Sequence, residues 1–154
     1  MALPKRQSNR LKDYDYRHQG VYFVTICVRD RLNLFWQPLA AVSAITETPP
    51  LSTQGYIVER CIQEMPIHYS GMQINGYVIM PNHVHLLLTL AEGCKVSLST
   101  MVNQLKGVVT RRLGRSIWQR SYHDHIVRDE QDYLRLTEYI MNNPLKWCDD
   151  QYYQ

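Results

Sequence analysis

The chain has 154 residues, 45% of them hydrophobic, which suits a single domain with a core of its own. Its 17 basic and 14 acidic residues leave a formal net charge of +3, a mild excess compatible with a polyanionic partner or with a solvated basic surface. No stretch approaches the roughly 18 apolar residues that a membrane helix needs, and nothing at the N-terminus has the pattern of a secretion signal.

The N-terminal part predicts an arm, a strand and a loop. Residues 1–20 mix basic and tyrosine residues with few aliphatic ones, which indicates an arm lying on the domain or on a ligand. Residues 21–28, VYFVTICV, are apolar at almost every position and predict a strand covered on both faces. Three prolines within residues 37–53 predict a loop.

The middle of the chain predicts a helix and a hairpin. Apolar residues at helical spacing from Ile57 to Met65 predict an amphipathic helix, with Ser52 or Thr53 as its cap and Pro66 as its end. Residues 72–80 and 83–90 predict two strands joined by a tight turn, because Pro81 and Asn82 between them are turn formers.

The C-terminal half predicts two more helices and a strand. Apolar residues recur at helical spacing from Leu98 to Leu113, and Gly114 is placed to end that helix. Residues 123–128, HDHIVR, predict a fourth strand. Acids at 129, 130 and 132 suit the first turn of a third helix that reaches about Asn143, before Pro144.

The order strand, helix, strand, strand, helix, strand, helix is typical of a ferredoxin-like α+β sandwich. We therefore expect an antiparallel sheet with helices on one face and one added C-terminal helix. Residues 1–154 form a single domain in this interpretation, with residues 1–20 as its N-terminal arm.

The basic residues are concentrated in one part of the chain. Residues 95–128 hold seven Lys or Arg and one acid, whereas residues 129–154 hold six acids and two bases. A nucleic acid and a solvated basic face are both consistent with this distribution. The four cysteines have no short spacing and indicate free thiols in a reducing cytoplasm.

Two histidines interrupt the apolar strand of residues 83–90. His83 and His85 are two apart and share one face of the strand, so their nitrogens could hold one divalent cation if a further ligand came from elsewhere. Partly buried histidines bonded to backbone would give the same pattern. His123 and His125 repeat the spacing around Asp124, so spacing alone does not choose between the pairs.

The third predicted helix supplies a candidate nucleophile. Tyr139 lies beside the predicted core face of that helix, and Asn143 is four residues further on, although Pro144 biases Asn143 away from helical geometry. A phenol with a pKa of about 10 attacks poorly unless a metal polarises the acceptor. An asparagine carbonyl could complete the metal site, while packing is the ordinary role of a tyrosine.

Several segments together resemble the HUH superfamily of single-stranded DNA nucleases, and within it the REP-associated tyrosine transposases, close to the small single-tyrosine transposases of bacterial insertion sequences. The segments are RLKDYDY, VYFVTICVRDR, MPNHVHLLL, WQRSYHDHIVRDEQDY and YIMNNPLKW, in the family's order. The resemblance implies the same ferredoxin-like fold and a location in the bacterial cytoplasm.

The resemblance also implies the site. His83 and His85 would bind Mg²⁺ or Mn²⁺, Tyr139 would be the nucleophile, and Asn143, next to Asn142, would be the third ligand. The HDH pair has a charged central residue and departs from the family's pattern. The implied DNA-binding residues are Arg10, Lys12, Arg111, Arg112, Arg115, Arg120 and Arg128, with Trp118 or Tyr122 stacking on an unpaired base.

The implied function is metal-dependent cleavage and strand transfer of single-stranded DNA through a 5′-phosphotyrosine intermediate, in DNA transposition. The ten residues after Pro144 leave little room for an extension that reads a hairpin, so hairpin DNA is the less secure of the two expected substrates. A homodimer, with the tyrosine helix acting in cis or in trans, stays open. The alternatives are a non-catalytic single-strand-binding module and a hydrolytic metal enzyme.

Overall fold

Four strands form one antiparallel sheet in the computed structural model, which describes residues 19–38 and 47–153. The strands are β1 (Gly20–Cys27), β2 (Met72–Ile79), β3 (His83–Leu90) and β4 (His123–Val127). Their order in the sheet is β2-β3-β1-β4, which places β3 and β1 at the centre. This is the strand order of a ferredoxin-like sandwich, and it confirms the predicted fold class.

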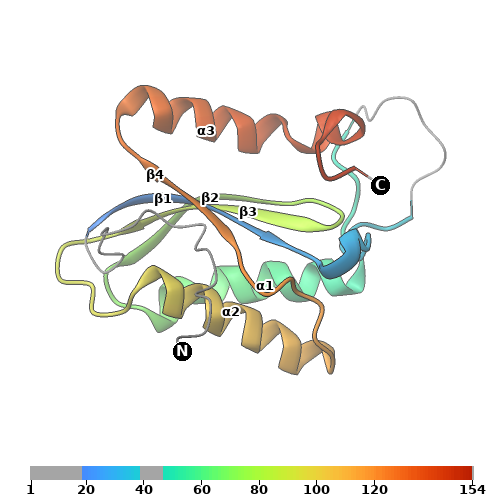
Figure 1. Cartoon of the computed structure of the whole chain (residues 1–154), viewed down its shortest axis with the longest axis horizontal. Helices are drawn as coiled ribbons and strands as arrows, with labels where there is room; N and C mark the ends of the chain where they lie inside the picture. The colour runs from blue at the N-terminus through green and yellow to red at the C-terminus, as the bar shows by residue number, and fades with distance from the viewer. Residues whose placement is uncertain (1–18, 39–46, 154) are drawn as a thin grey trace, which may run out of the picture.

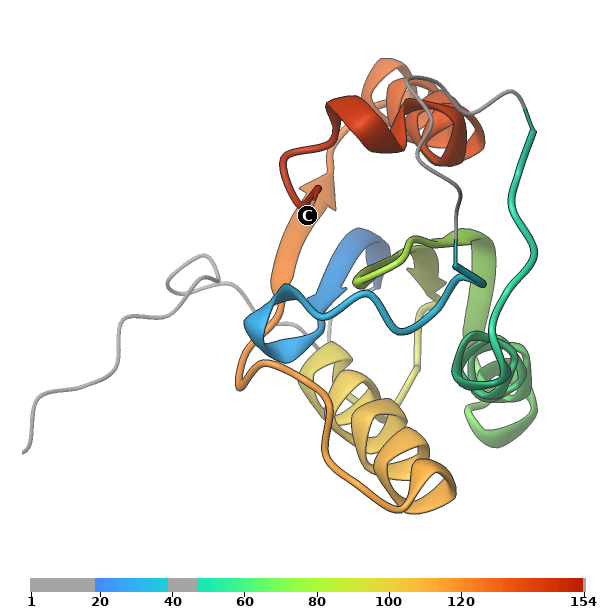
Figure 2. The same cartoon turned by 90° about the vertical axis from the view of Figure 1, so that its right-hand side faces the viewer.

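The helices cover the two faces of the sheet unequally. Helices α1 (Thr53–His68) and α2 (Leu98–Leu113) lie together on one face, and α3 (Glu130–Asn142) lies on the other (Figure 1). The short helix η2 (Pro144–Asp149) continues from α3 and stays on the same side, as the turned view in Figure 2 also shows. No helix in the described ranges is long and apolar enough to cross a membrane.

The central strand β3 is buried along nearly its whole length. Its side chains alternate between the faces, so Val84, Leu86 and Leu88 point toward α1 and α2, while His83 and His85 point toward α3. The apolar run on both strands β1 and β3 reflects this position between two helical layers. The sheet therefore delivers both histidines to the face that α3 covers.

The caps of α1 and α2 follow the sequence closely. Ser52, rather than Thr53, caps α1 by accepting a hydrogen bond from the backbone N–H of Gly55 at 3.1 Å. Ser97 caps α2 in the same way, and Gly114 ends it with a left-handed φ of 78°.

Two predictions about proline were wrong. Pro66 does not end α1, because the helix continues to His68 and the N–H of Tyr69 bonds to the carbonyl of Met65. A proline in a last turn removes one backbone donor, and here the following residues still close the turn. Pro144 ends α3, but it does not move Asn143 out of helical geometry, since Asn143 has φ −60° and ψ −44°.

Parts of the predicted arm and loop cannot be compared with the structure. Residues 1–18, with Arg10 and Lys12, lie outside the described residues, as do residues 39–46 of the predicted loop. After β1 the chain enters the short helix η1 (Arg29–Arg31), in which Asp30 and Arg31 have positive φ values of 60° and 54°.

Candidate active site

His83 and His85 lie side by side in the interior, under α3 and η2. Their side chains are almost fully buried, with 0% and 2% of each residue exposed, and their ring centroids are 4.7 Å apart. Strand β1 runs alongside, with Cys27 opposite His83 and Thr25 opposite His85. The pair therefore forms one compact cluster of imidazoles on the α3 side of the sheet.

Each ring has one nitrogen in a hydrogen bond and one nitrogen that makes none. Nδ1 of His85 is hydrogen-bonded to the hydroxyl of Thr25 at 2.8 Å, and Nδ1 of His83 to Oδ1 of Asn82 at 2.9 Å. Both Nε2 atoms are buried and make no hydrogen bond. Buried polar atoms are normally satisfied, so two unsatisfied nitrogens this close together indicate a site for a bound group.

Burial keeps both imidazoles neutral. It lowers the pKa of His83 to about 2, with a contribution from neighbouring His85, and the pKa of His85 to about 3. The two rings thus have unprotonated nitrogens at neutral pH, which is the form that binds metals.

Tyr139 brings a phenol from α3 to this cluster. Its ring centroid is 5.4 Å from that of His85 and 6.0 Å from that of Phe23, both in edge-on geometry. The residue is 42% exposed, and it lines a cleft of about 590 Å³ between α3, η2 and the residues that follow. A ligand in the cleft can therefore reach the phenol directly.

Asn143 lies one helical turn beyond Tyr139 and lines the same cleft. Only 3% of it is exposed, and its amide nitrogen Nδ2 is buried without a hydrogen bond. If the side-chain amide of Asn143 is flipped by 180°, its oxygen takes the buried position of Nδ2, and an oxygen there can bind a cation.

Two residues near the C-terminus also lie close to the histidines, and neither belongs to a motif or spacing that predicted this position. Oδ2 of Asp150 is 3.8 Å from Nε2 of His83, and the ring of Tyr152 lies 4.4 Å from the His83 ring. Burial raises the pKa of Asp150, and it raises the pKa of Tyr152 to about 12. Tyr152 is therefore a poorer nucleophile than an ordinary phenol, whereas Tyr139 faces the open cleft.

The second histidine pair has a different environment. His123 and His125 are exposed on the edge strand β4, and Nε2 of His125 is 2.7 Å from the Asp132 carboxylate at the start of α3. Within the described part of the chain, no three His, Cys, Asp or Glu residues are grouped to hold a metal.

The residues predicted to bind DNA differ in their exposure and in their contacts. Arg115, Arg120 and Arg128 are exposed, whereas the guanidinium of Arg112 donates to the Glu64 carboxylate at 2.7 Å. Trp118 and Tyr122, predicted to stack on an unpaired base, are 6% and 1% exposed. That prediction was wrong, because both aromatic rings are part of the packed core.

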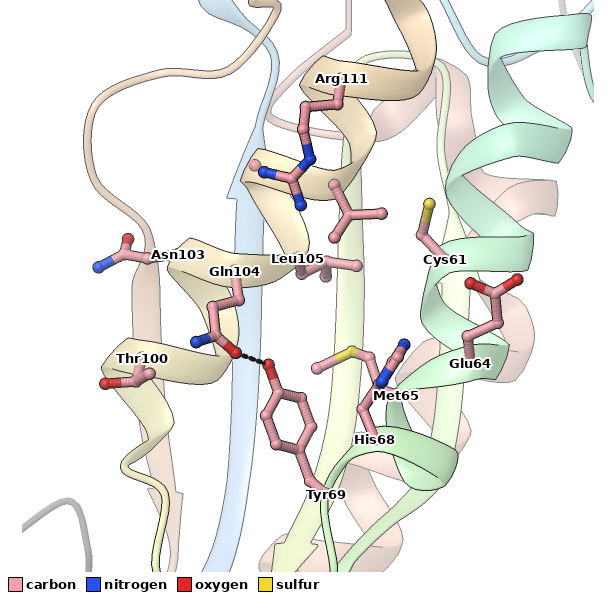
Figure 3. A pocket seen from close by; sticks show the side chains of 12 residues that line it. Cys61, Glu64, Met65, His68, Tyr69, Thr100, Asn103, Gln104, Leu105 and Arg111 are labelled. Atoms are coloured by element: carbon pink, nitrogen blue, oxygen red, sulfur yellow. Dashed lines mark hydrogen bonds between the residues drawn. The ribbon is translucent and has the colours of Figure 1, made fainter.

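Arg111 faces a different hollow. This hollow, of about 770 Å³, lies between α1 and α2 (Figure 3). It is on the face of the sheet opposite to α3, the helix that carries Tyr139 (Figure 1). Tyr69 and Gln104 close one end of it through a hydrogen bond between their side chains. Arg111 and Arg112 are thus not brought together with the histidines and Tyr139.

The fold and the site define a class of proteins in which a helix-borne tyrosine lies over paired histidines on a ferredoxin-like sheet. Residues 57–143 match the family model described as Transposase IS200 like. That match covers more than half of the chain and spans His83, His85, Tyr139 and Asn143. The chain belongs to this family, and it is a tyrosine transposase, a DNA-processing enzyme of a generally metal-dependent kind.

The chain is also similar to individual proteins, two of which are REP-associated tyrosine transposases. The chain is 34% identical over 177 residues to a Haemophilus influenzae protein described as uncharacterized, covering 99% of this chain and 95% of the relative. It is 35% identical over 132 residues to the REP-associated tyrosine transposase of Escherichia coli, covering 85% of this chain and 70% of that protein. A solved structure of a REP-associated tyrosine transposase bound to a REP hairpin superposes with a TM-score of 0.67 at 26% identity, covering 92% and 74% of the two chains.

Proposed function

We propose that this transposase cuts and rejoins single-stranded DNA with Tyr139 as its nucleophile. The observation that carries the proposal is the position of the Tyr139 ring, exposed to the cleft and 5.4 Å from His85, whose Nε2 has no hydrogen-bond partner. A nucleophile beside two neutral imidazole nitrogens that are free to bind a cation is suited to metal-assisted phosphoryl transfer.

The proposed step exchanges one phosphate ester for another. The phenol oxygen of Tyr139 forms a bond to phosphorus and the bond from phosphorus to the 3′ oxygen breaks, leaving a 5′-phosphotyrosine link and a free 3′-hydroxyl. The phenol loses a proton and the leaving oxygen gains one, so the step needs no ATP. Attack by another 3′-hydroxyl reverses it and joins strands, as DNA transposition requires.

His83, His85 and Asn143 are the proposed metal-binding residues, for Mg²⁺ or Mn²⁺. The fit rests on chemistry already described: two neutral Nε2 atoms and one amide end, all buried and without hydrogen bonds. When bound, such an ion polarises a phosphoryl oxygen and stabilises the charge that develops on it. The protein itself positions the phenol, since the rings of Phe23 and His85 both make edge-on contacts with the Tyr139 ring.

Cations along the cleft would hold the DNA backbone. Arg135 and Lys146 line the cleft together with Tyr139, although neither was among the predicted DNA-binding residues. We assign the backbone contacts beyond the cleft to Arg115, Arg120 and Arg128, which are exposed. A hairpin is included as a proposed substrate because a relative is bound to a REP hairpin.

The test uses one oligonucleotide labelled in turn at each end, incubated with protein and Mn²⁺. We expect the 3′-labelled strand to become protein-linked and the 5′-labelled strand to yield a shorter free fragment. Tyr139→Phe should abolish the adduct while DNA binding persists, whereas Tyr153→Phe, a change at another exposed tyrosine, should leave the adduct intact.

Three results would contradict the proposal. An unchanged adduct in Tyr139→Phe would remove Tyr139 as the nucleophile. Salt-sensitive binding without any covalent product would indicate a binding module, and cut DNA without a protein link would indicate hydrolysis.

A further inference from the structure

Asn82 is buried immediately before the histidine strand and uses both ends of its amide. It is 2% exposed in the turn between β2 and β3. Its Oδ1 is 2.9 Å from Nδ1 of His83, and its Nδ2 donates to the backbone carbonyl of Tyr152 at 2.7 Å and more weakly to that of Arg31 at 3.4 Å. One side chain thus joins a proposed metal ligand to two distant backbone segments.

These contacts fix the orientation of the amide. The carbonyl oxygens of Arg31 and Tyr152 can only accept hydrogen bonds, so the NH₂ group of Asn82 must face them. The amide oxygen must then face the His83 ring, and it can only accept. Nδ1 of His83 therefore carries the proton, and a neutral imidazole with its proton on Nδ1 has an unprotonated Nε2.

Nε2 of His83 makes no hydrogen bond that would hold a proton on it. Oδ2 of the Asp150 carboxylate is 3.8 Å away, which is too long for a hydrogen bond. By contrast, Thr25 does not fix the tautomer of His85, because a hydroxyl can donate to Nδ1 or accept from it.

We propose that Asn82 is a positioning residue that holds His83 in the Nδ1–H tautomer and so directs the Nε2 lone pair toward the metal position. The inference rests on the proposed metal site at His83 and His85. The amide that accepts from His83 is in turn oriented by the backbone carbonyls of Arg31 in η1 and of Tyr152 after η2. Groups that orient metal-binding histidines in this way commonly change metal affinity by about 10–100-fold.

The experiment compares Asn82→Ala with Asn82→Asp. A carboxyl group keeps an oxygen that accepts from Nδ1–H, but it loses the NH₂ group that holds the two carbonyls. Alanine loses both functions. Tautomers of the metal-free protein are determined from long-range ¹H–¹⁵N spectra of the imidazoles, Mn²⁺ affinity by calorimetry, and folding by thermal unfolding.

We expect His83 to be the Nδ1–H tautomer in wild type and in Asn82→Asp, with similar Mn²⁺ affinities. In Asn82→Ala we expect a mixture of tautomers and an affinity about 10–100-fold lower. If the role were only structural, the two variants would lose affinity together, and that result would overturn the inference. So would an Nε2–H tautomer of His83 in wild type, a result that does not depend on whether the alanine variant folds.

The results that would contradict the proposed function differ from those that would contradict the role of Asn82. A wild-type protein that binds Mn²⁺ and shows the Nδ1–H tautomer, but forms no DNA adduct, would contradict the assignment of Tyr139 chemistry and leave the role of Asn82 in place. An active enzyme whose Asn82→Ala variant keeps its tautomer and its Mn²⁺ affinity would contradict the role of Asn82 alone.

Discussion

His85 and His125 show how far environment decides what a histidine can do. His85 is buried on a central strand, neutral, with Nε2 unsatisfied, whereas His125 is exposed on an edge strand and paired with Asp132. A metal needs an unprotonated nitrogen that is not already engaged. In the β3 pair both Nε2 atoms are buried and make no hydrogen bond, whereas in the β4 pair Nε2 of His125 already pairs with the Asp132 carboxylate.

The two pairs can be compared directly by substitution. His83→Gln or His85→Gln should lower Mn²⁺ affinity by more than about 10-fold. Changing a residue that only orients a metal ligand already costs about 10–100-fold, so changing the ligand itself should cost at least as much. The matched controls His123→Gln and His125→Gln should leave the affinity near the wild-type value. Calorimetric titration measures all four, and a greater loss in the controls would transfer the metal site to β4.

Sequence reasoning found the residues of the site that carry recognisable chemistry. The β3 histidines, Tyr139 and Asn143 do lie together, as predicted, although their metal binding and catalysis stay predictions. It missed Thr25 and Asp150, which approach the histidines only through strand pairing and the return of the last residues over the sheet. Neither residue stands at a spacing that would have indicated this.

At the scale of elements, the packing of α3 against the sheet determines where the phenol lies. Ile140, next to Tyr139, is 7% exposed and belongs to the core, whereas Met141, one residue further, is 74% exposed. The helix is also anchored at its start, where Asp129 caps it and Asp132 pairs with His125. The buried face of α3 thus holds Tyr139 beside the cleft.

Two adjacent α3 residues, one buried and one exposed, test whether packing of α3 on the sheet contributes to the free energy of unfolding. Ile140→Ala should lower the free energy of unfolding by about 2–5 kcal/mol, because it leaves a cavity between α3 and the sheet. Met141→Ala removes a side chain of similar size from the surface and should change stability by less than about 0.5 kcal/mol. Urea unfolding measures both, and equal losses would show that α3 does not pack as described.

Element type and order were predictable, while the effects of two prolines were not. Hydrophobic periodicity placed α2 at Leu98–Leu113 and the hairpin strands within a residue of their observed ends, because burial on one or both faces dictates those patterns. The proline rules failed at Pro66 and Asn143. At each point the neighbouring backbone remained helical despite the proline, so a local preference gave way to the surrounding fold.

For the whole molecule, one chain holds every residue of the proposed site. The ring centroid of Tyr139 is 5.4 Å from that of His85 in the same chain, so we expect an active site in cis. Sequence reasoning left cis and trans arrangements open, since a helix position relative to a second subunit has no local signature.

Mixing inactive variants tests this arrangement. In cis, neither His85→Gln nor Tyr139→Phe has a complete site, so a mixture of the two should form no DNA adduct. In trans, the first variant would lend its tyrosine helix to the histidines of the second, and adduct would return. Separate reactions of each variant are the controls, and a recovered adduct would contradict the cis arrangement.

The most direct test of the central claim is to locate the DNA on the protein. After reaction with single-stranded DNA, nuclease trimming and trypsin digestion, the residual nucleotide should be attached to the peptide of residues 136–146, in which Tyr139 is the one tyrosine. Tandem mass spectrometry should then assign the phosphate to that side chain. A nucleotide on Tyr152, whose ring lies 4.4 Å from His83, or the absence of any linked peptide from protein that cuts DNA, would contradict the account.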